Sequence, residues 1–240
     1  MPKNRNTGIE ISDINISKVE DALKRTKKGQ MLPEIAEGLR KYVWLISEFS
    51  DKEMNVLEGE RGRQFQEIYT DFFKLFSESR LSKERKAEAC SKYYKVMQCY
   101  RENPELIQKC MEIENDTIFE AVLQCLYPIR TCVEASFGSK LLSMINPSRP
   151  VWDTRVRKNL KMSPIQGTLE ERIENAVATY SCLREKYKNF FNKDKAIAKE
   201  WIELFDNSPD IKPIIKEAKT KNVEITKVKK IDLILWQIRD

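Results

Sequence analysis

Two residues, Lys140 and Asp153, have types and surroundings that could support covalent chemistry on an electrophilic carbon. They flank a short loop in the stretch ASFGSKLLSMINPSRPVWDTRVRKNL, residues 135–160. Lys140 stands in an apolar run near the expected start of a helix, where burial and the helix dipole both favour the neutral, nucleophilic amine. Asp153 directly precedes another helical pattern, so it is expected to cap that helix and to remain ionised. Such a carboxylate can stabilise a positive charge that develops beside it.

Each of these residues also has a simpler interpretation. Most lysines lie in solvent on an amphipathic helix, and an aspartate before a helix is often only a cap. Pro147 and Pro150 restrict the loop between the two residues, so the pair is expected to be held together before any substrate arrives.

The composition excludes several other kinds of chemistry. The chain has no histidine, which excludes Ser-His-Asp and Cys-His catalysis and histidine metal sites. Its six cysteines include no pair with CxxC spacing, so we expect reduced thiols, no metal and no cofactor. The remaining candidates for catalysis are Lys, Asp, Glu, Tyr, Cys and Arg.

The overall balance of the 240 residues is that of a soluble protein. The net charge of +6 permits a polyanionic partner without requiring one. No apolar run is long enough to cross a bilayer, and the N-terminus lacks the apolar core of a secretory signal. We therefore expect a cytoplasmic protein that does not bind membranes.

Nearly every segment repeats its apolar residues at helical spacing, which predicts an all-α protein of about ten helices in two packed lobes. Residues 1–30 are expected to form an N-terminal arm, and residues 31–240 a single domain. The segment TKVKKIDLILWQI, residues 226–238, is compatible with either a helix or a strand. An aromatic stripe is expected in the core, made of Phe65, Phe72, Phe73 and Phe76.

The segment PVWDTRVRKNL resembles the Pro-Val-Asp-Thr-His-Val segment of the helix-hairpin-helix DNA glycosylases, the superfamily of endonuclease III and 8-oxoguanine glycosylase. In that family a helix with the catalytic lysine precedes this segment, and here FGSKLL occupies that place. The pattern of a helix, then Asn-Pro, a short loop and Pro-x-Trp-Asp is similar to prokaryotic 8-oxoguanine-glycosylase-like proteins. The family's Gly-x-Gly hairpin and the cysteine spacing of its iron–sulfur loop are absent, and Arg155 replaces its histidine.

This resemblance implies a fold and a reaction. The fold would be a divergent helix-hairpin-helix glycosylase fold. Lys140 would attack the sugar C1′ of a nucleotide flipped out of the duplex and form a Schiff base, which allows strand cleavage. Asp153 would stabilise the oxocarbenium-like charge. The protein would excise a damaged or modified base, in repair or in anti-phage defence, as a monomer that binds DNA.

Five further residues are candidates for contact with DNA. Trp152 and Trp236 could stack on an extruded base, although aromatic residues in helical proteins more often belong to the core. Arg155, Arg157 and Lys158 could bind phosphates beside the active site, or could form a solvated helix face. The same two readings apply to the basic group at residues 227–230.

Two other functions remain open from the sequence. The chain could be a helical nucleic-acid-binding protein without catalysis, or a helical bundle that binds other proteins. Covalent trapping on DNA would distinguish the glycosylase from both, and salt dependence would distinguish the last two from each other.

Overall fold

A computed structural model of the chain describes residues 8–26, 31–75, 82–114, 116–130 and 135–239. Over these residues the protein is all-α, as predicted, with twelve α-helices, one short 3₁₀-helix (η1) and no strand. In chain order the elements are η1 (Ile11–Asp13), α1 (Ile16–Lys24), α2 (Glu34–Ser50), α3 (Gly59–Phe73), α4 (Lys83–Glu102), α5 (Pro104–Met111), α6 (Thr117–Arg130), α7 (Ala135–Ile145), α8 (Thr154–Asn159), α9 (Leu169–Asn192), α10 (Lys195–Asn207), α11 (Lys212–Thr220) and α12 (Lys227–Gln237).

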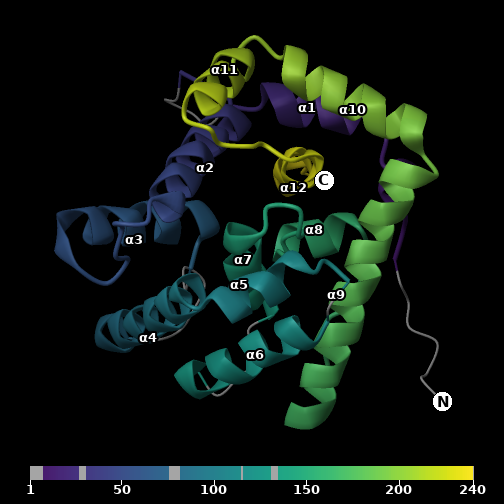
Figure 1. Ribbon diagram of the computed structural model, residues 1–240. Coiled ribbons are helices and arrows are strands. Elements are labelled where there is room, and N and C mark those ends of the chain that lie inside the picture. The colour runs from purple at the N-terminus through teal and green to yellow at the C-terminus, as the bar shows by residue number, and fades with distance from the viewer. Residues whose placement is uncertain (1–7, 27–30, 76–81, 115, 131–134, 240) are drawn as a thin grey trace.

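The helices form two packed groups (Figure 1). Helices α3 to α7 make up one group, and α1 with α10 to α12 makes up the other. Helix α2 packs on both α3 and α12, and the long α9 packs on both α6 and α10, so these two helices join the groups. One continuous hydrophobic core runs through both groups.

The described part of the N-terminal segment is not a free arm. Within residues 8–26, Ile11, Val19 and Ala22 are fully buried. Helix α1 packs on α2, α10 and α12, and η1 packs on α9. The expectation of an arm is wrong for these residues, because the short amphipathic α1 buries its apolar face against the second group of helices.

Aromatic side chains join α3 to α4 in the first group. Phe65, Tyr69 and Phe73 are buried, and the hydroxyls of Tyr69 and Tyr93 hydrogen-bond at 2.8 Å. Phe72 is only half-buried and lines a cavity described below, whereas Phe76 lies outside the described residues.

The ambiguous C-terminal segment forms helix α12. It begins with Thr226, whose side chain accepts a hydrogen bond from Lys229 N. Helices α1, α2, α8 and α10 all pack on it, and the apolar positions from Ile231 to Leu235 are buried. The described structure has no strand with which this segment could pair. Its backbone therefore forms its hydrogen bonds within a helix, despite the β-branched residues.

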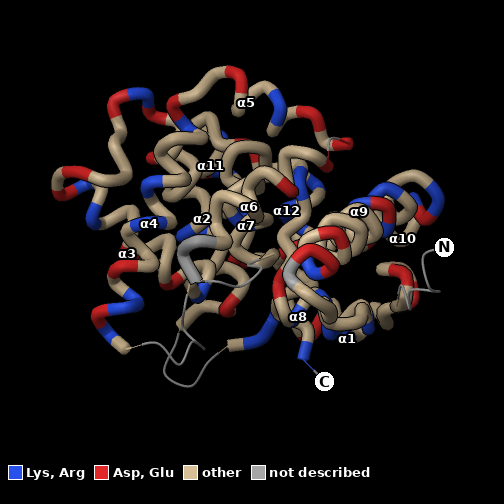
Figure 2. Tube along the Cα trace, turned by 90° about the horizontal axis from the view of Figure 1, so that it is seen from below, with Lys and Arg blue, Asp and Glu red and all other residues tan. Residues whose placement is uncertain are grey.

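Charged positions of both signs alternate over the surface (Figure 2). Several form pairs within one helix, such as Lys92 with Glu88 and Lys199 with Glu203. Of the helices the structure describes, none combines the length and the apolar character needed to cross a membrane.

Candidate functional site

Lys140 and Asp153 lie side by side. Lys140 Nζ, on α7, is 3.5 Å from Oδ2 of Asp153, which precedes α8. The two side chains are 5% and 17% exposed, so the pair is largely shielded from water. The expectation that the loop holds these two residues together is confirmed.

The amine of Lys140 has other partners besides this carboxylate. It donates a hydrogen bond of 2.7 Å to the carbonyl oxygen of Phe73 at the end of α3. It also lies 5.9 Å from the ring centre of Phe73 and 5.6 Å from that of Phe137. Lys140 sits in the middle of α7, not near its start, so the helix dipole has little influence on it. Burial between aromatic rings is the main feature of its environment.

Asp153 caps α8, as predicted. Its Oδ1 accepts a hydrogen bond of 2.8 Å from Arg155 N, while Oδ2 faces Lys140. The cap fixes the rotation of the carboxylate, so one oxygen is presented to the amine in a defined direction.

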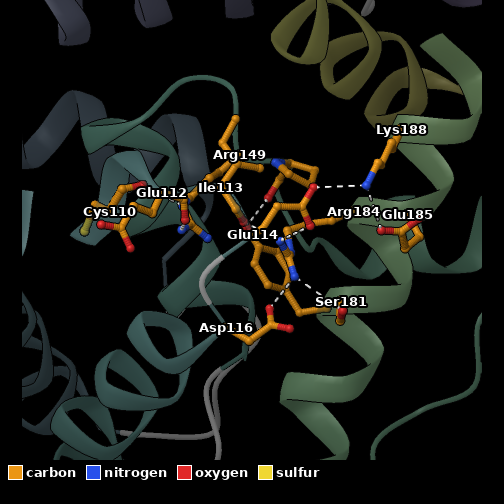
Figure 3. Close-up of polar contacts among 12 residues, drawn as sticks. Cys110, Glu112, Ile113, Glu114, Asp116, Arg149, Ser181, Arg184, Glu185 and Lys188 are labelled. Carbon is orange, nitrogen blue, oxygen red and sulfur yellow. Dashed lines mark hydrogen bonds and ion pairs between the residues drawn. The ribbon is translucent and has the colours of Figure 1, made fainter. Parts of the chain in front are cut away.

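Arg149 anchors the loop that connects the two residues. This arginine is fully buried, and its guanidinium donates to the carbonyl oxygens of Cys110 and Glu112 (Figure 3), the first of them at 2.8 Å. These carbonyls lie at the C-terminal end of α5, where backbone acceptors have no partner within the helix. Asn146 Nδ2 also donates to Cys110 O, at 3.2 Å.

Arg184 of α9 holds the segment that follows α5 (Figure 3). It donates to Ile113 O and to Asp116 Oδ1, the latter at 2.5 Å, and forms an ion pair with Glu114. The residues that directly follow the acceptors of Arg149 are therefore held by α9.

The rest of the loop is anchored at further points. Tyr180 Oη donates to Pro150 O at 3.0 Å, and Thr226 Oγ1 donates to Pro147 O at 2.7 Å. Trp152 N donates to Ser139 Oγ at 2.9 Å, directly beside Lys140 in α7. The loop therefore contacts α5, α7, α9 and the start of α12, and these contacts set the separation of Lys140 and Asp153.

A cavity opens beside the pair, between the two groups of helices. It has a volume of about 40 Å³ as it stands, enough for roughly three water molecules. Its lining comes from α3, α7, α8, α12 and the loop before α8: Phe72, Phe73, Lys140, Val151, Asp153, Val156, Lys229, Asp232, Leu233 and Trp236. Phe72 and Trp236 are half-buried, and the remaining apolar lining residues are buried.

A second lysine–aspartate pair lines the same cavity. Lys229 Nζ lies 3.5 Å from Asp232 Oδ2, and both side chains are at most 5% exposed. Tyr187 Oη donates to Asp232 Oδ1 at 2.5 Å, and Val151 N donates to Oδ2 at 3.1 Å. The sequence suggested only that Lys229 belongs to an exposed or phosphate-binding basic group, and its burial corrects this.

Burial shifts the proton affinity of both members of this second pair. It lowers the pKa of Lys229, and the nearby Asp232 carboxylate opposes that shift. Burial also raises the pKa of Asp232 to about 6, against the opposing effects of Lys229, Tyr187 and Val151 N. The sequence signal for this pair was a Lys-x-x-Asp spacing inside an apolar helix, which places both charges on one buried face.

The structure separates the two candidate tryptophans. Trp236 lines the cavity, and the guanidinium carbon of Arg155 lies 4.8 Å from the centre of its ring. Trp152 is only 6% exposed and packs in the core, with no part in the lining. Trp152 therefore does not face the cavity, although its neighbours Val151 and Asp153 do.

Two arginines contact Trp236. Arg155 lies over the Trp236 ring, and Arg239 Nη1 donates to Trp236 O at 2.7 Å. Burial lowers the pKa of Arg239. The charges of Arg155 and Arg25 lower it further, while those of Glu34, which ion-pairs with Arg239 at 3.8 Å, and Asp153 oppose the shift. Clustered arginines that repel one another are typical of a surface that binds anions. Arg157 and Lys158 continue this basic character along α8.

The arrangement supports amine and carboxylate chemistry. In the described part of the chain, no group of three or more metal-ligating side chains lies together. The five cysteines in that part are free thiols. The groups available at the cavity are two lysines, two aspartates and aromatic side chains.

Comparisons with known proteins identify no relative. No protein-family model matches the chain, and neither the curated proteins nor the solved structures that were searched gave a match.

Proposed function

We propose that the protein is a DNA glycosylase with lyase activity that removes a damaged or modified base. The observation that carries the proposal is the buried pair of Lys140 and Asp153, 3.5 Å apart at the wall of a cavity. The resemblance of residues 135–160 to the helix-hairpin-helix DNA glycosylases supports it. The helix with the lysine, the Asn-Pro loop and the capping aspartate occur in the order that this family uses.

The reaction would begin with proton transfer from Lys140 to Asp153. The free amine then forms a bond to C1′ of the extruded nucleotide, and the bond between C1′ and the base breaks. The electron pair leaves with the base, which takes up the proton from Asp153. Opening of the sugar ring gives a protonated Schiff base, and loss of a 2′ proton then expels the 3′ phosphate. As Asp153 passes that proton to the base it becomes an anion, and this carboxylate stabilises the positive charge that develops at C1′.

A base can enter the cavity only if side chains at its mouth move, because the cavity holds only a few waters as it stands. Phe72 and Trp236 are the half-buried residues of the lining, so they are the side chains expected to move. Once displaced, the aromatic rings would stack against the face of the base.

The arginines beside Trp236 suit the DNA backbone. Arg25, Arg155 and Arg239 would bind phosphates next to the extruded nucleotide, and Arg157 and Lys158 would extend the contact along α8. In this proposal the protein acts as a cytoplasmic monomer on duplex DNA, in repair or in defence against phage DNA.

The test is incubation with a panel of duplexes that each carry one modified base, with and without borohydride. Borohydride reduces a Schiff base to a stable amine, so an active enzyme should give a covalent protein–DNA adduct. Excision of a base without an adduct would make the protein a glycosylase that activates water through Asp153. Salt-dependent DNA binding without excision or adduct would instead support a non-catalytic nucleic-acid-binding protein.

A further inference from the structure

Lys229 and Asp232 line the cavity but have no part in the reaction assigned to Lys140 and Asp153. A buried pair of charges is costly unless its hydrogen bonds are satisfied. The two partners differ in this respect. Asp232 accepts hydrogen bonds from Tyr187 Oη and Val151 N in addition to its ion pair, so its position is fixed from three sides.

Lys229 is held less completely. Its amine lies 3.5 Å from Asp232 Oδ2 and 4.9 Å from the ring centre of Tyr42. Among the residues that the structure describes, its Nζ makes no hydrogen bond shorter than that ion pair. The amine therefore retains N–H donors at the wall of the cavity, and this holds whether the nitrogen is protonated or neutral.

The surroundings of this amine are those of a site for a flat polar ligand. Phe72, Leu233 and Trp236 provide apolar surface in the same cavity, while Lys229 provides a donor. Pockets that bind small molecules combine apolar walls with a few fixed polar groups in this way.

We propose that Lys229 donates a hydrogen bond to a carbonyl oxygen on the extruded base, and that Asp232 and Tyr42 hold its amine in place for this contact. The proposal rests on the glycosylase function above. If Lys229 makes this contact, the enzyme should prefer a base that carries a carbonyl oxygen over a base that lacks such an acceptor. A base without the acceptor would leave the buried amine without its partner, which costs binding energy.

The experiment compares two reactions of the same enzyme. The first is excision from duplexes that contain uracil, hypoxanthine or 8-oxoguanine, with ethenoadenine as the base that lacks a carbonyl. The second is borohydride trapping on a duplex with a preformed abasic site, which needs Lys140 but has no base for Lys229 to contact. Lys229→Met removes the donor, Lys229→Gln keeps an N–H donor, and the double variant Lys229→Met with Asp232→Asn removes both charges in case the single variant does not fold.

We expect the wild type to excise at least one carbonyl base faster than ethenoadenine. Lys229→Met and the double variant should lower that rate about 10- to 100-fold, the value of a lost hydrogen bond to a charged group. Lys229→Gln should recover part of it, and trapping at the abasic site should stay within about twofold of wild type.

Three results would overturn the inference. The first is a wild type that prefers ethenoadenine or acts on none of the carbonyl bases. The second is an unchanged excision rate in Lys229→Met. The third is a loss of abasic-site trapping in Lys229→Met that equals its loss of excision. A wild type that traps abasic DNA but excises no carbonyl base would overturn only this inference. A wild type with neither reaction would overturn the proposed function as well.

Discussion

The carboxylate of Asp153 divides its two oxygens between two partners, because Oδ1 accepts from Arg155 N at 2.8 Å and Oδ2 lies 3.5 Å from Lys140 Nζ. The helix cap therefore orients the group that would stabilise charge in the reaction. A structural role and a chemical role are combined in one side chain, and a substitution can separate them.

Asp153→Asn should retain the cap and lose the activity. Asparagine caps helices about as well as aspartate. The neutral amide cannot stabilise a cationic transition state, so the excision rate should fall about 10²- to 10⁴-fold. The free energy of unfolding should change by less than about 2 kcal/mol, since Lys140 keeps its bond to Phe73 O. Single-turnover excision and urea denaturation measure the two effects.

The chain offers a precedent and a control for this change. Asn103 already caps α5, accepting from Glu105 N at 3.0 Å and Leu106 N at 3.1 Å. Asp194 precedes α10 without a side-chain cap bond, so Asp194→Asn is a matched change of charge at another helix start. Wild-type excision by Asp153→Asn would show that Asp153 is only a cap.

Lys140→Gln should abolish the adduct that borohydride traps. Only an amine can form the Schiff base, whereas the variant should remain folded because the glutamine amide keeps an N–H donor for the carbonyl oxygen of Phe73. Denaturing gels of reduced reactions measure the adduct, and circular dichroism checks the fold. Lys92→Gln, a change at an exposed lysine of α4, is the control. Full excision by Lys140→Gln would refute the role of Lys140.

Removing Arg155 and Arg239 together should weaken the salt dependence of DNA binding. Each lost phosphate contact lowers the slope of log K against log salt by about 0.9, so two contacts should lower it by about 2. Fluorescence anisotropy with a labelled duplex at several salt concentrations measures the slope. Lys199→Ala with Lys219→Ala removes the same charge from α10 and α11 and should leave the slope close to wild type. Equal slopes in both double variants would place the arginines away from the DNA.

Asp232 should make the stability of the protein depend on pH between about 4 and 6. Its pKa is about 6 in the folded protein and 3.8 ordinarily, so the folded state binds a proton that the unfolded state has released in this range. Unfolding free energy therefore falls as pH rises through the window, by up to roughly 3 kcal/mol for this group. Urea denaturation of wild type and Asp232→Asn at several pH values isolates this contribution, because the other carboxylates are common to both. Parallel pH profiles would contradict it.

Arg149→Met should reduce both stability and activity. The change removes the donor of the Glu112 carbonyl and one of the two donors of the buried Cys110 carbonyl, which should cost about 3 kcal/mol. The loop also sets the separation of Lys140 and Asp153, so excision should fall about 10- to 100-fold in the folded variant. Tyr180→Phe removes one bond to the same loop and should cost about 1 kcal/mol. A stable Arg149→Met protein with wild-type excision would show that this anchor is dispensable.

The helical class and the position of the main pair could be predicted from the sequence. Apolar spacing at helical period is a local property, and it holds for nearly every segment. Lys140 and Asp153 are close in the chain, and two prolines and a cap restrict the loop between them, so their proximity could be predicted. The contacts of the loop with α5, α9 and α12 then set the separation of the two groups. The same reasoning could not distinguish a helix from a strand for residues 226–238. Their β-branched residues are compatible with both until the elements that pack around them are known.

Only the tertiary structure decided which charges are buried. The Lys-x-x-Asp spacing puts Lys229 and Asp232 on one face of α12, and Lys229 is buried because helices far away in sequence enclose α12. Trp152 and Trp236 were both candidates for stacking on an extruded base. Trp152 packs in the core, whereas Trp236 lines the cavity. Nothing in the sequence around Arg149 indicates its partners, which are two carbonyl oxygens at the end of α5. Hydrophobic spacing determines which face of a helix is buried, but the depth of burial and the partners of a polar group depend on elements that the chain brings together only on folding.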